Sequence, residues 1–435
     1  MTSIWTSSAD LPHFPAFEGS KKTDVLIIGG GMAGILCAYF LQKQGVDYML
    51  VEGGRICSKI TRDTTAKITA QHGLIYSKLL HEMGEEKTRM YLCANQEAVR
   101  RYLELCRNLD ADFEEKTSYI YSVDNRKKLE KEMDALSRIG FKAVFAEHTS
   151  LPFQTAGAVG FLQQAQFHPL KFAAQIADGL RIFENTFVTE LKDHTAVTEC
   201  GNISFRKVIV ATHFPIINRH GMYFLKMYQN RSYVIALLGV PALDGMYMDE
   251  SEAGFSFRSY KNFLLLGGSG HRTGTCGGKW EVLRQFAKYH YPDSDIKYTW
   301  AAQDCMTLDG APYIGPYSRY TPDWFVATGF HKWGMTSAMV SAMILTDLAL
   351  ERKNPYSSVF DPSRTMKKTQ LLANGWAAAV NFLAPSKKRC PHLGCAVKWN
   401  GAEESWDCPC HGSRFDDKGR MTDNPAIRDL NIGKH

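Results

Sequence analysis

The amino-acid sequence predicts an α/β fold, α+β overall, and three observations carry this prediction. A short apolar strand pattern runs into a glycine-rich turn and a helical pattern within residues 25–41. Alternating aromatic and polar runs fill much of residues 222–298, and two cysteine and histidine boxes lie at residues 390–395 and 408–413. We therefore expect a parallel-sheet domain, an antiparallel-sheet domain and a small C-terminal β-type module.

The first unit consists of a strand, a turn and a helix. Residues 25–28 form the strand pattern, Gly29, Gly31 and Gly34 form a G-x-G-x-x-G turn, and residues 35–41 continue as a helix. In such a turn the first glycine permits the tight bend and the second lets the backbone approach a pyrophosphate. The third lets the helix pack closely on the strand. The pattern predicts a Rossmann-like dinucleotide-binding domain.

A second strand at residues 48–51 ends in Glu52, about twenty residues after the turn, where a carboxylate can accept the ribose hydroxyls. This unit serves flavin and nicotinamide cofactors alike, but distant segments favour FAD. Residues 207–212 and 324–329 are apolar strand patterns, and residues 330–336 open a long helix. The N-terminus of that helix suits negative charge at the N1/C2 edge of a flavin.

The rest of the chain is assigned from these anchors. Runs such as residues 233–238 and 262–266 predict an antiparallel sheet over the cofactor, while residues 88–106 and 169–180 have helical patterns. The predicted organisation is a discontinuous FAD-binding domain at residues 20–75, 140–215 and 300–360, a substrate domain at 76–139 and 216–299, a linker at 361–386, and a cluster-binding module at 387–435.

The C-terminal boxes each offer one sulfur and one nitrogen as metal ligands. Cys390 and His392 are spaced C-x-H, and Cys408 and His411 are spaced C-x-x-H. Two thiolates plus two imidazoles suit a Rieske [2Fe–2S] cluster, in which the neutral ligands raise the reduction potential. A tetrahedral zinc ion is the alternative for four such ligands.

Two further cysteines, Cys395 and Cys410, lie at matching offsets in the two boxes. A disulfide between them would pin the two loops together over the cluster. Only about thirty residues, helical in pattern, separate Ser363 from Cys390, so the module is short for a Rieske domain. A module of this size buries little apolar area, so we expect the metal and docking against the flavin domain to stabilise it.

These motifs together carry a resemblance to a known family. The N-terminal fingerprint and residues 64–69, 309–315 and 329–336 resemble the D-amino-acid oxidase/glycine oxidase superfamily of FAD enzymes. Nearly the whole chain resembles bacterial FAD-dependent oxidoreductases that carry a C-terminal Rieske domain. The fingerprint and the resemblance give the following candidate cofactor-binding residues: Gly29, Gly31, Met32, Ala33, Gly34, Glu52, Gly53, Thr65, Ala66, Lys67, Val188, Ala211, Thr212, Gly315, Gly329, Gly334, Met335 and Thr336.

The resemblance also implies a chemistry. Superfamily members transfer a hydride from the carbon beside an amine to flavin N5, giving an imine that water hydrolyses. A one-electron cluster would then pass the electrons singly to an external acceptor, which indicates a dehydrogenase acting on an amine or amino-acid-like substrate. Two alternatives are a reductase fed by NAD(P)H or a partner protein, and an oxygenase with a mononuclear iron. We expect neither, because the sequence has no second G-x-G-x-x-G and no iron-binding domain after the boxes.

Four residues are candidates for contact with substrate or flavin. Arg258, on a predicted strand, could clamp a substrate carboxylate or be an ordinary surface arginine. His271 follows a glycine-rich turn and could face the flavin or be a polar loop residue. By the resemblance Lys332 and Trp333 lie beside the flavin, where Lys332 would tune its reactivity, or else Lys332 points to solvent at the helix start.

Structural roles are predicted for three other polar residues, and composition limits the partners. Gln303 and Asp304 are expected to hold the following turn without touching substrate, and Lys59 to face solvent. The composition, 45% hydrophobic and 22% charged, suits a packed enzyme of two or three domains, and a formal charge of +6 without a basic stripe argues against nucleic-acid binding. No segment approaches ~18 uninterrupted apolar residues, so we expect no membrane span, and a cytoplasmic location is the default.

Overall fold

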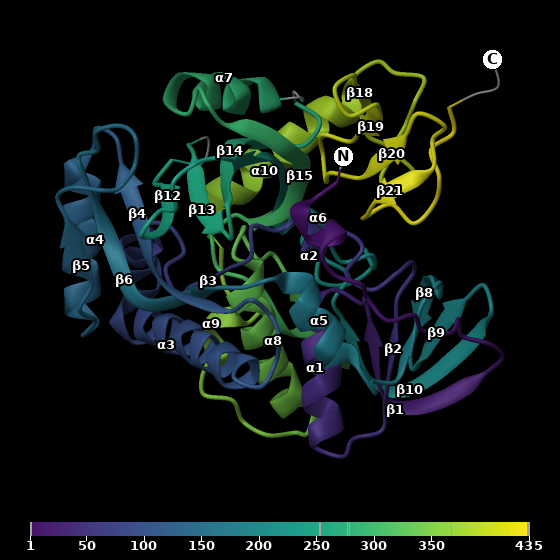
Figure 1. Cartoon of the computed structure of the whole chain (residues 1–435). Helices are drawn as coiled ribbons and strands as arrows, with labels where there is room; N and C mark the ends of the chain where they lie inside the picture. Colours follow the sequence, from purple (N-terminus) through teal and green to yellow (C-terminus); the bar gives the residue numbers. More distant parts are fainter. Residues whose placement is uncertain (1, 252–253, 276, 278, 367, 433–435) are drawn as a thin grey trace.

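The structure is a computed structural model that describes residues 2–251, 254–275, 277, 279–366 and 368–432. Within these residues the strands form two large sheets and one small sheet (Figure 1). The predicted α/β class, with a parallel-sheet domain, an antiparallel-sheet domain and a small β-rich C-terminal module, is confirmed.

The first sheet is the dinucleotide-binding sheet, with the strand order β16-β17-β10-β1-β2-β7 and the pair β8 and β9 at its side. Strand β1 pairs in parallel with β10 and β2, and β10 pairs in parallel with β17. Its strands are β1 (Lys21–Ile28), β2 (Tyr48–Val51), β7 (Ile182–Phe183), β8 (Val188–Lys192), β9 (Thr195–Thr198), β10 (Gly201–Val210), β16 (Tyr313–Ser318) and β17 (Thr321–Thr328).

Register explains why the functional turns meet at one edge of this sheet. Ile28 at the end of β1 is paired with Val51 and with Val210, and Val210 is paired with Val326. Since parallel strands end at the same edge, the segments that follow β1, β2, β10 and β17 all emerge together. That edge is where a nucleotide binds in open α/β sheets.

The second sheet is mostly antiparallel, with the order β15-β11-β14-β13-β12-β4-β6-β3 and β5 paired to β6. Only the β12 and β4 pairing, between its two halves, is parallel. Its strands are β3 (Lys67–Ile68), β4 (Glu114–Ser122), β5 (Val144–Ala146), β6 (Gly157–Gln166), β11 (Met227–Leu238), β12 (Gly245–Asp249), β13 (Ser256–Tyr260), β14 (Phe263–Arg272) and β15 (Asp295–Thr307).

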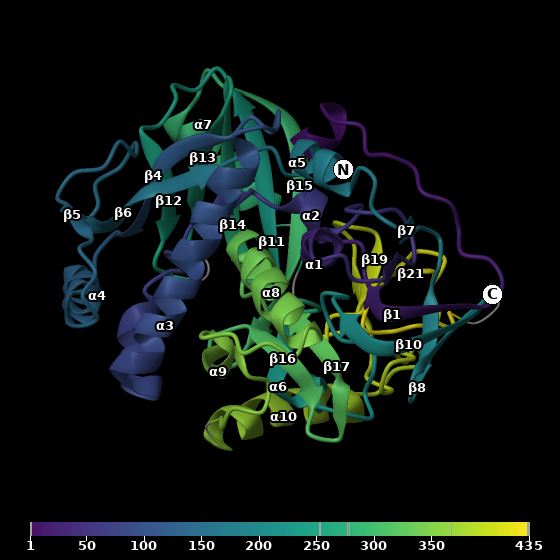
Figure 2. The ribbon, with the colours of Figure 1, turned by 90° about the horizontal axis from the view of Figure 1, so that it is seen from below.

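Helices fill the space between the sheets and cover their outer faces. Helix α8 is apolar or small on nearly every side and packs against α1, α3 and strands of both sheets, so it is a core helix (Figure 2). The helices are η1 (Ile4–Ser7), α1 (Met32–Lys43), α2 (Ile60–Asp63), α3 (Ile75–Cys106), α4 (Arg126–Arg138), α5 (Pro169–Ala177), α6 (Tyr223–Lys226), α7 (Trp280–His290), α8 (Gly334–Ala349), α9 (Ser357–Phe360) and α10 (Lys368–Leu383).

The C-terminal module is a four-stranded antiparallel sheet that follows α10. Its strands are β18 (Lys398–Asn400), β19 (Ser405–Asp407), β20 (Arg414–Asp416) and β21 (Met421–Asp423). Figure 1 shows this module, in yellow, beside the β14 and β15 end of the second sheet and above the first sheet. The predicted linker is therefore largely a helix, as its pattern indicated, and residues 433–435 lie outside the described part of the chain.

Three segments lie in a different sheet from the one predicted. Residues 67–68, assigned to the FAD-binding domain, form β3 of the second sheet. Residues 144–166 were assigned to the FAD-binding domain, but they form β5 and β6 of the second sheet. Residues 300–307 likewise belong to β15 of the second sheet. The reason is that strand partners are chosen over long sequence distances, and an apolar strand pattern does not reveal which sheet it joins.

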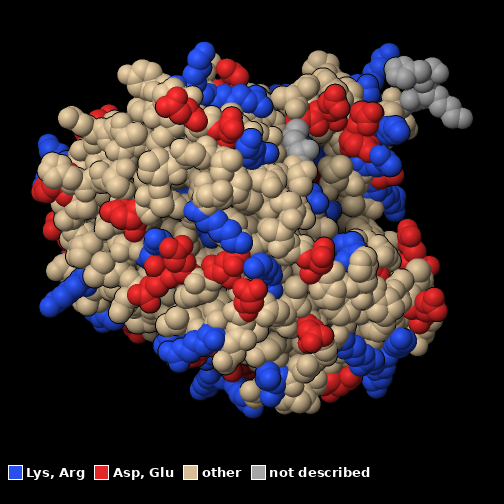
Figure 3. Space-filling model, viewed as in Figure 1, with Lys and Arg blue, Asp and Glu red and all other residues tan. Residues whose placement is uncertain are grey.

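Charged residues on the surface are mixed in sign. Figure 3 shows Lys and Arg interspersed with Asp and Glu over the face seen in Figure 1. This face has no single-sign stripe of the kind that tracks a nucleic-acid backbone.

Candidate functional site

A cavity of about 600 Å³ lies where the carboxyl edge of the first sheet faces the second sheet. Its lining comes from the turns after β1 and β2, the end of β10, strands β11, β14 and β15, and the start of α8. The C-terminal module also contributes, through Met421, Asp423 and Asn424. Segments far apart in the sequence are thus brought to one site.

The predicted dinucleotide turn forms one side of this cavity. Gly29, Gly31, Met32 and Ala33 line it, and the Met32 amide donates to Thr61 Oγ1 at 3.1 Å. A Cβ on Gly29 would lie 2.5 Å from the carbonyl oxygen of Ala211, so only glycine permits this approach of β1 to β10. The turn leaves backbone groups open at the start of α1, as a pyrophosphate site requires.

Gly34 has the packing role that the motif predicts. It is buried inside α1 rather than at the cavity, and a Cβ there would lie 1.9 Å from the carbonyl oxygen of Gly29. Helix and strand can therefore pack this closely only because the residue has no side chain.

Glu52 lies at the end of β2, in the position predicted for a ribose-binding carboxylate. Its two carboxylate oxygens accept the amide protons of Gly30 at 2.7 Å and Gly54 at 2.9 Å. Glu52 lines the cavity together with Gly53, and Val188 lies at the same end. The two amide bonds fix the carboxylate at the cavity wall, where its remaining lone pairs can accept hydroxyls.

Six further residues predicted to bind cofactor line the cavity, while five others support it from behind. Thr65, Val188, Ala211, Thr212, Gly334 and Met335 are lining residues. The supporting residues are Ala66, Lys67, Gly315, Gly329 and Thr336, none of which lines the cavity.

The supporting residues act through packing and hydrogen bonds. Thr336 Oγ1 lies 3.1 Å from the carbonyl oxygen of Thr69 and 2.9 Å from His72 Nε2, which ties α8 to the loop before α3. Gly329 has a φ of 71°, and a Cβ there would lie 2.3 Å from Thr307. These two residues hold the cavity wall from behind.

The remaining supporting residues lie at the back of the wall. Lys67 is buried and donates to Thr65 Oγ1 at 3.1 Å, and burial lowers its pKa to about 7. Gly315 packs against Pro362. Lys59, which was expected to face solvent, is exposed and lies at the rim of the cavity.

Arg258 lies neither at the cavity, where a substrate clamp would be, nor at the surface. Arg258 is fully buried and does not line the cavity. Its guanidinium donates to Gln166 Oε1 at 3.0 Å and to the carbonyl oxygens of Ala66 at 2.9 Å and Phe167 at 2.8 Å. Because protein acceptors already engage this fork, Arg258 holds the segment around Ala66 in place and is not available to a substrate carboxylate.

His271 is also not part of the cavity lining. Its Nε2 lies 3.0 Å from the hydroxyl of Tyr233, and its Nδ1 lies 2.9 Å from the carbonyl oxygen of Arg272. The neighbouring Arg272 donates to the carbonyl oxygens of Pro409 at 3.1 Å and Cys410 at 3.0 Å. This end of β14 therefore serves the contact with the C-terminal module.

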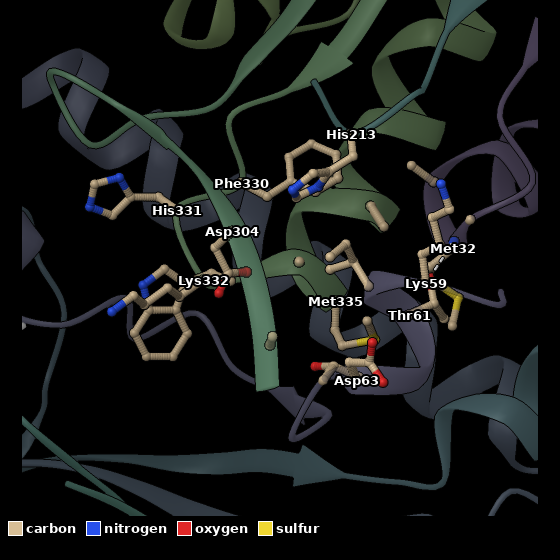
Figure 4. A pocket seen from close by; sticks show the side chains of 18 of the residues that line it. Met32, Lys59, Thr61, Asp63, His213, Asp304, Phe330, His331, Lys332 and Met335 are labelled. Atoms are coloured by element: carbon tan, nitrogen blue, oxygen red, sulfur yellow. Dashed lines mark hydrogen bonds between the residues drawn. The ribbon is translucent and has the colours of Figure 1, made fainter. Parts of the chain in front are cut away.

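Asp304 and Lys332 are a pair of oppositely charged residues in the cavity lining. Figure 4 shows them on one side, with Met32, Lys59 and Thr61 on the other. Burial raises the pKa of Asp304 to about 6, although Lys332 acts in the opposite direction. The sequence predicts that Asp304 holds the following turn without touching substrate; in the structure, strand pairing turns its side chain into the cavity.

The backbone at Lys332 is in an uncommon conformation. His331 and Lys332 have φ values of 51° and 70°, in the left-handed region that non-glycine residues rarely adopt. Such residues cost on the order of 1–3 kcal/mol each and persist only where surrounding contacts hold them. Here the amide of His331 donates to the carbonyl oxygen of Cys305 at 2.9 Å, which fixes the bend before α8.

Trp333 completes this side of the cavity. Its ring stacks on that of His72 at a centroid distance of 5.0 Å and an interplanar angle of 14°. Burial lowers the pKa of His72 to about 3, so the stacked imidazole is neutral. Trp333 lines the cavity as predicted and closes it on the α3 side.

Sequence reasoning missed two buried residues at this site. Asp63, at the end of α2, lines the cavity, and burial raises its pKa to about 6. His213, just after β10, also lines it; burial lowers its pKa to about 4, and its Nε2 has no hydrogen-bond partner among the described residues. The only signal in the sequence was their position directly after predicted cofactor-binding segments.

The four predicted cluster ligands converge in the C-terminal module. Cys390 and Cys408 are buried and hydrogen-bonded to each other through sulfur, and the rings of His392 and His411 lie 5.0 Å apart. The Nδ1 atoms of both rings are buried and have no hydrogen-bond partner within the described chain. Two sulfurs and two unpartnered nitrogens are the donor set that a Rieske cluster requires.

The second ring nitrogen of each histidine is held by residues between β10 and β11. His392 Nε2 lies 2.8 Å from Asn218 Oδ1, and the ring of His411 hydrogen-bonds to the backbone of Phe224. Such partners orient a ligating ring and fix its tautomer. Burial lowers the pKa of His392 to about 4 and that of His411 to about 3, so both rings are neutral, the form that binds metal.

The predicted disulfide is present between Cys395 and Cys410. The sulfur of Cys408 lies within 4.8 Å of both disulfide sulfurs, so the bond lies beside the ligand set. Ser413 hydrogen-bonds to the sulfur of Cys390 and accepts the amide proton of Ala426 at 3.0 Å. The loops are therefore fixed by one covalent bond and by a hydroxyl directed at a ligand sulfur.

A short segment after β10 joins the cavity to the cluster site. Thr212 and His213 line the cavity, and the ring of the next residue, Phe214, lies 6.5 Å from that of His392 and 6.2 Å from that of His411. One covalently continuous stretch of three residues thus contacts both sites.

The C-terminal module docks through polar side chains of the second sheet. Gln229 donates to the carbonyl oxygen of His411 at 2.7 Å, and Gln303 donates to that of Gly412 at 2.8 Å. Arg231 forms an ion pair with the buried Glu403. Burial would raise the pKa of Glu403, but Arg231 outweighs it and holds the pKa below its usual value.

Comparison with known protein families fits this geometry. The family profile described as FAD dependent oxidoreductase matches residues 24–348, about three quarters of the chain. The chain belongs to this family. A second profile, Rieske [2Fe-2S] domain, matches residues 376–433, which replaces the zinc alternative. This FAD-dependent oxidoreductase therefore uses FAD and a Rieske [2Fe–2S] cluster.

Individual relatives of this FAD-dependent oxidoreductase fall into two groups. The Bacillus subtilis (strain 168) protein described as "Putative Rieske 2Fe-2S iron-sulfur protein YhfW" is 33% identical over 489 residues, covering 98% of this chain and 96% of that protein. Among solved structures, glycine oxidase from Geobacillus kaustophilus aligns with a TM-score of 0.67 at 19% identity, covering 80% of this chain and 100% of that one. L-proline dehydrogenase from P.horikoshii aligns with a TM-score of 0.67 at 17% identity, covering 81% and 98%. These structural matches show the shared fold.

Among the residues that the structure describes, none of the helices combines the length and apolar character needed to span a bilayer.

Proposed function

We propose that this protein is a dehydrogenase that oxidises an amine or amino-acid-like substrate by hydride transfer to flavin and passes the electrons singly through the cluster to an external acceptor. The observation that carries this proposal is the shared wall between the two sites. One cavity is lined by the dinucleotide turn at Gly29 to Ala33 and by Asp423 and Asn424 of the cluster module. Because the flavin site adjoins a one-electron carrier, electrons from the flavin can pass to the cluster.

The charged pair in the cavity supports an amino-acid-like substrate. Such a substrate carries an ammonium and a carboxylate, and Asp304 and Lys332 offer one complementary charge to each. The pKa of Asp304, raised to about 6 by burial, suits a group that accepts a proton near neutral pH. Glycine oxidase and L-proline dehydrogenase, which share the fold, are named for amino-acid substrates.

The opposite side of the cavity suits the cofactor. The α1 N-terminus and Glu52 would hold the pyrophosphate and ribose of FAD, and the N-terminus of α8 faces the same cavity through Gly334 and Met335. When bound, FAD supplies the two-electron chemistry by taking a hydride from the carbon beside the nitrogen. The stacked rings of Trp333 and His72 exclude water from this end.

The contact between the sites supports electron transfer between the flavin and the cluster. Phe214 packs against both cluster histidines, and its covalent neighbour His213 lines the cavity. Asn424 of the module donates to the carbonyl oxygen of Phe214 at 2.8 Å, which clamps this segment against the cluster loop. The rigid contact gives electrons a short connection through bonded and packed atoms.

The test is an anaerobic titration of the holoprotein with glycine, L-proline and other amino acids and amines, and separately with NADH. Flavin absorbance and the EPR signal of the reduced cluster are recorded together. We expect an amino acid or amine to bleach the flavin and then to produce the cluster signal. Reduction by NADH alone would show instead a reductase, and bleaching without a cluster signal would contradict the electron route.

A paired substitution tests the route itself. Phe214→Leu removes the ring that links the cavity segment to both histidines. Phe224→Leu removes a ring that contacts one of the two histidines, His411, and lies outside the cavity segment. We expect the first substitution to slow the cluster signal without slowing flavin bleaching, and the second to leave both rates near those of the natural protein. Equal effects of the two substitutions would argue against Phe214 as the connection.

A further inference from the structure

Helix α10 presents an apolar stripe to the outside of the molecule. Leu372, Trp376, Val380 and Leu383 follow a spacing of four, four and three residues, which places them on one face of the helix. They are 72%, 73%, 50% and 78% exposed. Single exposed apolar residues are ordinary, but four in helical register on one helix form a continuous patch.

The patch continues onto the cluster module. Phe382 is exposed on the same helix turn as Leu383, and its ring packs against Gly394 of the first cluster loop. Leu393 in that loop is also exposed. We name the set Leu372, Trp376, Val380, Phe382, Leu383 and Leu393 the α10 patch. The α10 patch lies directly beside the loop that carries Cys390 and His392.

The inner face of α10 is hydrogen-bonded to the rest of the protein. Asn374 is buried; its amide donates to the carbonyl oxygen of Leu225 at 3.1 Å, and its Oδ1 accepts from Arg272 at 3.0 Å. The amide of Ala396 in the cluster loop donates to the carbonyl oxygen of Asn381 at 3.0 Å. Figure 2 shows α10 at the edge of the molecule beside α6. The patch therefore faces outward on a helix that is held in place from behind.

The segment that carries the patch is basic in sequence. Residues 362–402 contain seven lysines and arginines and no aspartate or glutamate, while the whole chain has a formal charge of +6. One of the seven, Arg364, is buried in an ion pair with Asp309. Lys387, Arg389 and Lys398 are exposed in the segment. An apolar stripe bordered by basic side chains is the composition of helices that lie in the interface of an anionic bilayer.

The dimensions of α10 suit lying on a bilayer rather than crossing it. The helix has 16 residues, which corresponds to a length of about 24 Å, and a bilayer span needs about 20 apolar residues. Trp, Phe and Leu are the side chains that enter the boundary between headgroups and acyl chains. A protein partner of matching shape would use the same apolar residues, but the run of basic side chains without any acidic residue favours a lipid surface.

We propose that the α10 patch docks this protein on the surface of an anionic lipid bilayer. Leu372, Trp376, Val380 and Leu383 enter the interface, and the exposed Lys387, Arg389 and Lys398 contact the headgroups. Docking in this orientation places the first cluster loop at the membrane surface. The proposal concerns where the protein binds, and it holds whether or not an amine is the substrate.

The test is flotation of the holoprotein with vesicles of phosphatidylcholine alone and of phosphatidylcholine with one quarter phosphatidylglycerol. We expect the protein to float with the anionic vesicles and to be released by high salt. The substitution Trp376→Ser with Leu383→Ser is expected to reduce the bound fraction at least tenfold. Leu162→Ser with Tyr289→Ser removes comparably exposed apolar side chains elsewhere and is expected to bind normally.

A second variant tests the contribution of charge to binding separately from that of the apolar stripe. Lys387→Glu with Lys398→Glu leaves the stripe intact and is expected to weaken binding to anionic vesicles. Flavin absorbance and the cluster EPR signal verify that each variant is folded.

Three results would overturn the proposal. In the first, the natural protein floats with neither kind of vesicle. In the second, the variant Trp376→Ser with Leu383→Ser floats to the same extent as the natural protein. Alternatively, the patch would prove to join two copies of the chain, seen as a dimer in size-exclusion chromatography that the same variant abolishes in the absence of vesicle binding. Because none of these measurements needs turnover, failure here is distinguishable from failure of the proposed dehydrogenase activity.

Discussion

Gln303 and Asp304 are neighbours on β15 and point to opposite sides of the strand, Gln303 to the cluster loop and Asp304 into the flavin cavity. Successive side chains of a strand alternate between its faces, so one strand serves both sites. A movement of β15 would therefore displace Asp304 in the cavity and the cluster loop that Gln303 contacts at the same time.

The substitution Asp304→Asn tests the proposed proton acceptor. A carboxyl with a pKa of about 6 is protonated below that pH and ionised above it, so kcat/KM for an amino acid is expected to rise with pH through about 6 and then level off. The amide cannot accept the proton, so the variant is expected to lose this rise and roughly 100-fold or more in rate. The measurement is kcat/KM against pH with an artificial acceptor.

Asp63→Asn is the matched control for this profile. Asp63 lines the same cavity, and burial raises its pKa to about 6 as well, but it lies on the cofactor side near Thr61 and Met335 (Figure 4). This variant is expected to keep the rise in kcat/KM near pH 6. If Asp63→Asn removed the rise and Asp304→Asn kept it, the assignment would have to be exchanged.

The substitution Ser413→Ala is expected to lower the reduction potential of the cluster. The Ser413 hydroxyl hydrogen-bonds to the sulfur of Cys390, and hydrogen bonds to cluster sulfurs stabilise the reduced state. Loss of about 1.4 kcal/mol from one such bond corresponds to a fall on the order of 60 mV for a one-electron couple. EPR-monitored redox titration measures the change.

Ser386→Ala serves as the control for that titration. Ser386 lies in the same module, but its hydroxyl donates to the carbonyl oxygen of Lys388 rather than to a ligand sulfur. The reduction potential of the cluster in this variant is expected to match that of the natural protein. A similar fall in both variants would point to a general loosening of the module instead of a lost hydrogen bond.

Removing Arg231 is expected to loosen the docking of the cluster module. Glu403 is buried and pairs with Arg231 and Arg414, so Arg231→Met leaves a buried carboxylate with one cationic partner. The expected cost is on the order of 3 kcal/mol. Lys128→Met, which breaks an exposed pair with Glu250, is expected to cost at most about 1 kcal/mol. Thermal unfolding and protease sensitivity of the module report both, and equal costs would contradict the buried role.

Acid should loosen the same contact. The pKa of Glu403 in the folded protein lies below its usual value, so its ion pairs stabilise docking at neutral pH and lose this effect as the pH falls through the folded pKa. The Arg231→Met variant is expected to show a weaker dependence of docking on pH in this acidic range. Protease sensitivity measured from neutral pH downward gives the comparison.

Loss of the disulfide is expected to destabilise the module without unfolding the flavin domain. Cys395 and Cys410 are separated by 15 residues, and closing a loop of this length contributes about 3 kcal/mol. The double substitution Cys395→Ala with Cys410→Ala should lower the temperature at which the cluster is lost while flavin absorbance persists. Simultaneous loss of both signals would show that the two parts unfold as one unit.

Local patterns were enough to predict the parts of the fold whose information is local. The G-x-G-x-x-G turn, the strands at β2, β10 and β17 and the cluster boxes were all found from spacing and periodicity. The glycines of the turn lie where backbone sterics require them, so their position in the sequence determines their position in space. The cysteine and histidine ligands are equally determined by their local spacing.

The substrate side of the cavity could not be predicted in the same way. Arg258 and Asp304 both lie on strands of the second sheet, and sequence reasoning placed the wrong one in the cavity. A one-residue change of register exchanges the two faces of a strand, and only the pairing of β15 with β11 decides which face Asp304 occupies. The assignment of residues 144–166 to the wrong sheet has the same cause.

The cluster module supplies Met421, Asp423 and Asn424 to the wall of the flavin cavity. To the extent that bound FAD contacts these residues, seating of the module strengthens the retention of FAD, and by thermodynamic reciprocity bound FAD strengthens the seating of the module by the same factor. Iron supply and flavin content are then linked within one chain. A cell short of iron would accumulate a protein that loses its flavin more easily, and so would carry few copies that hold a reduced flavin without an outlet for its electrons.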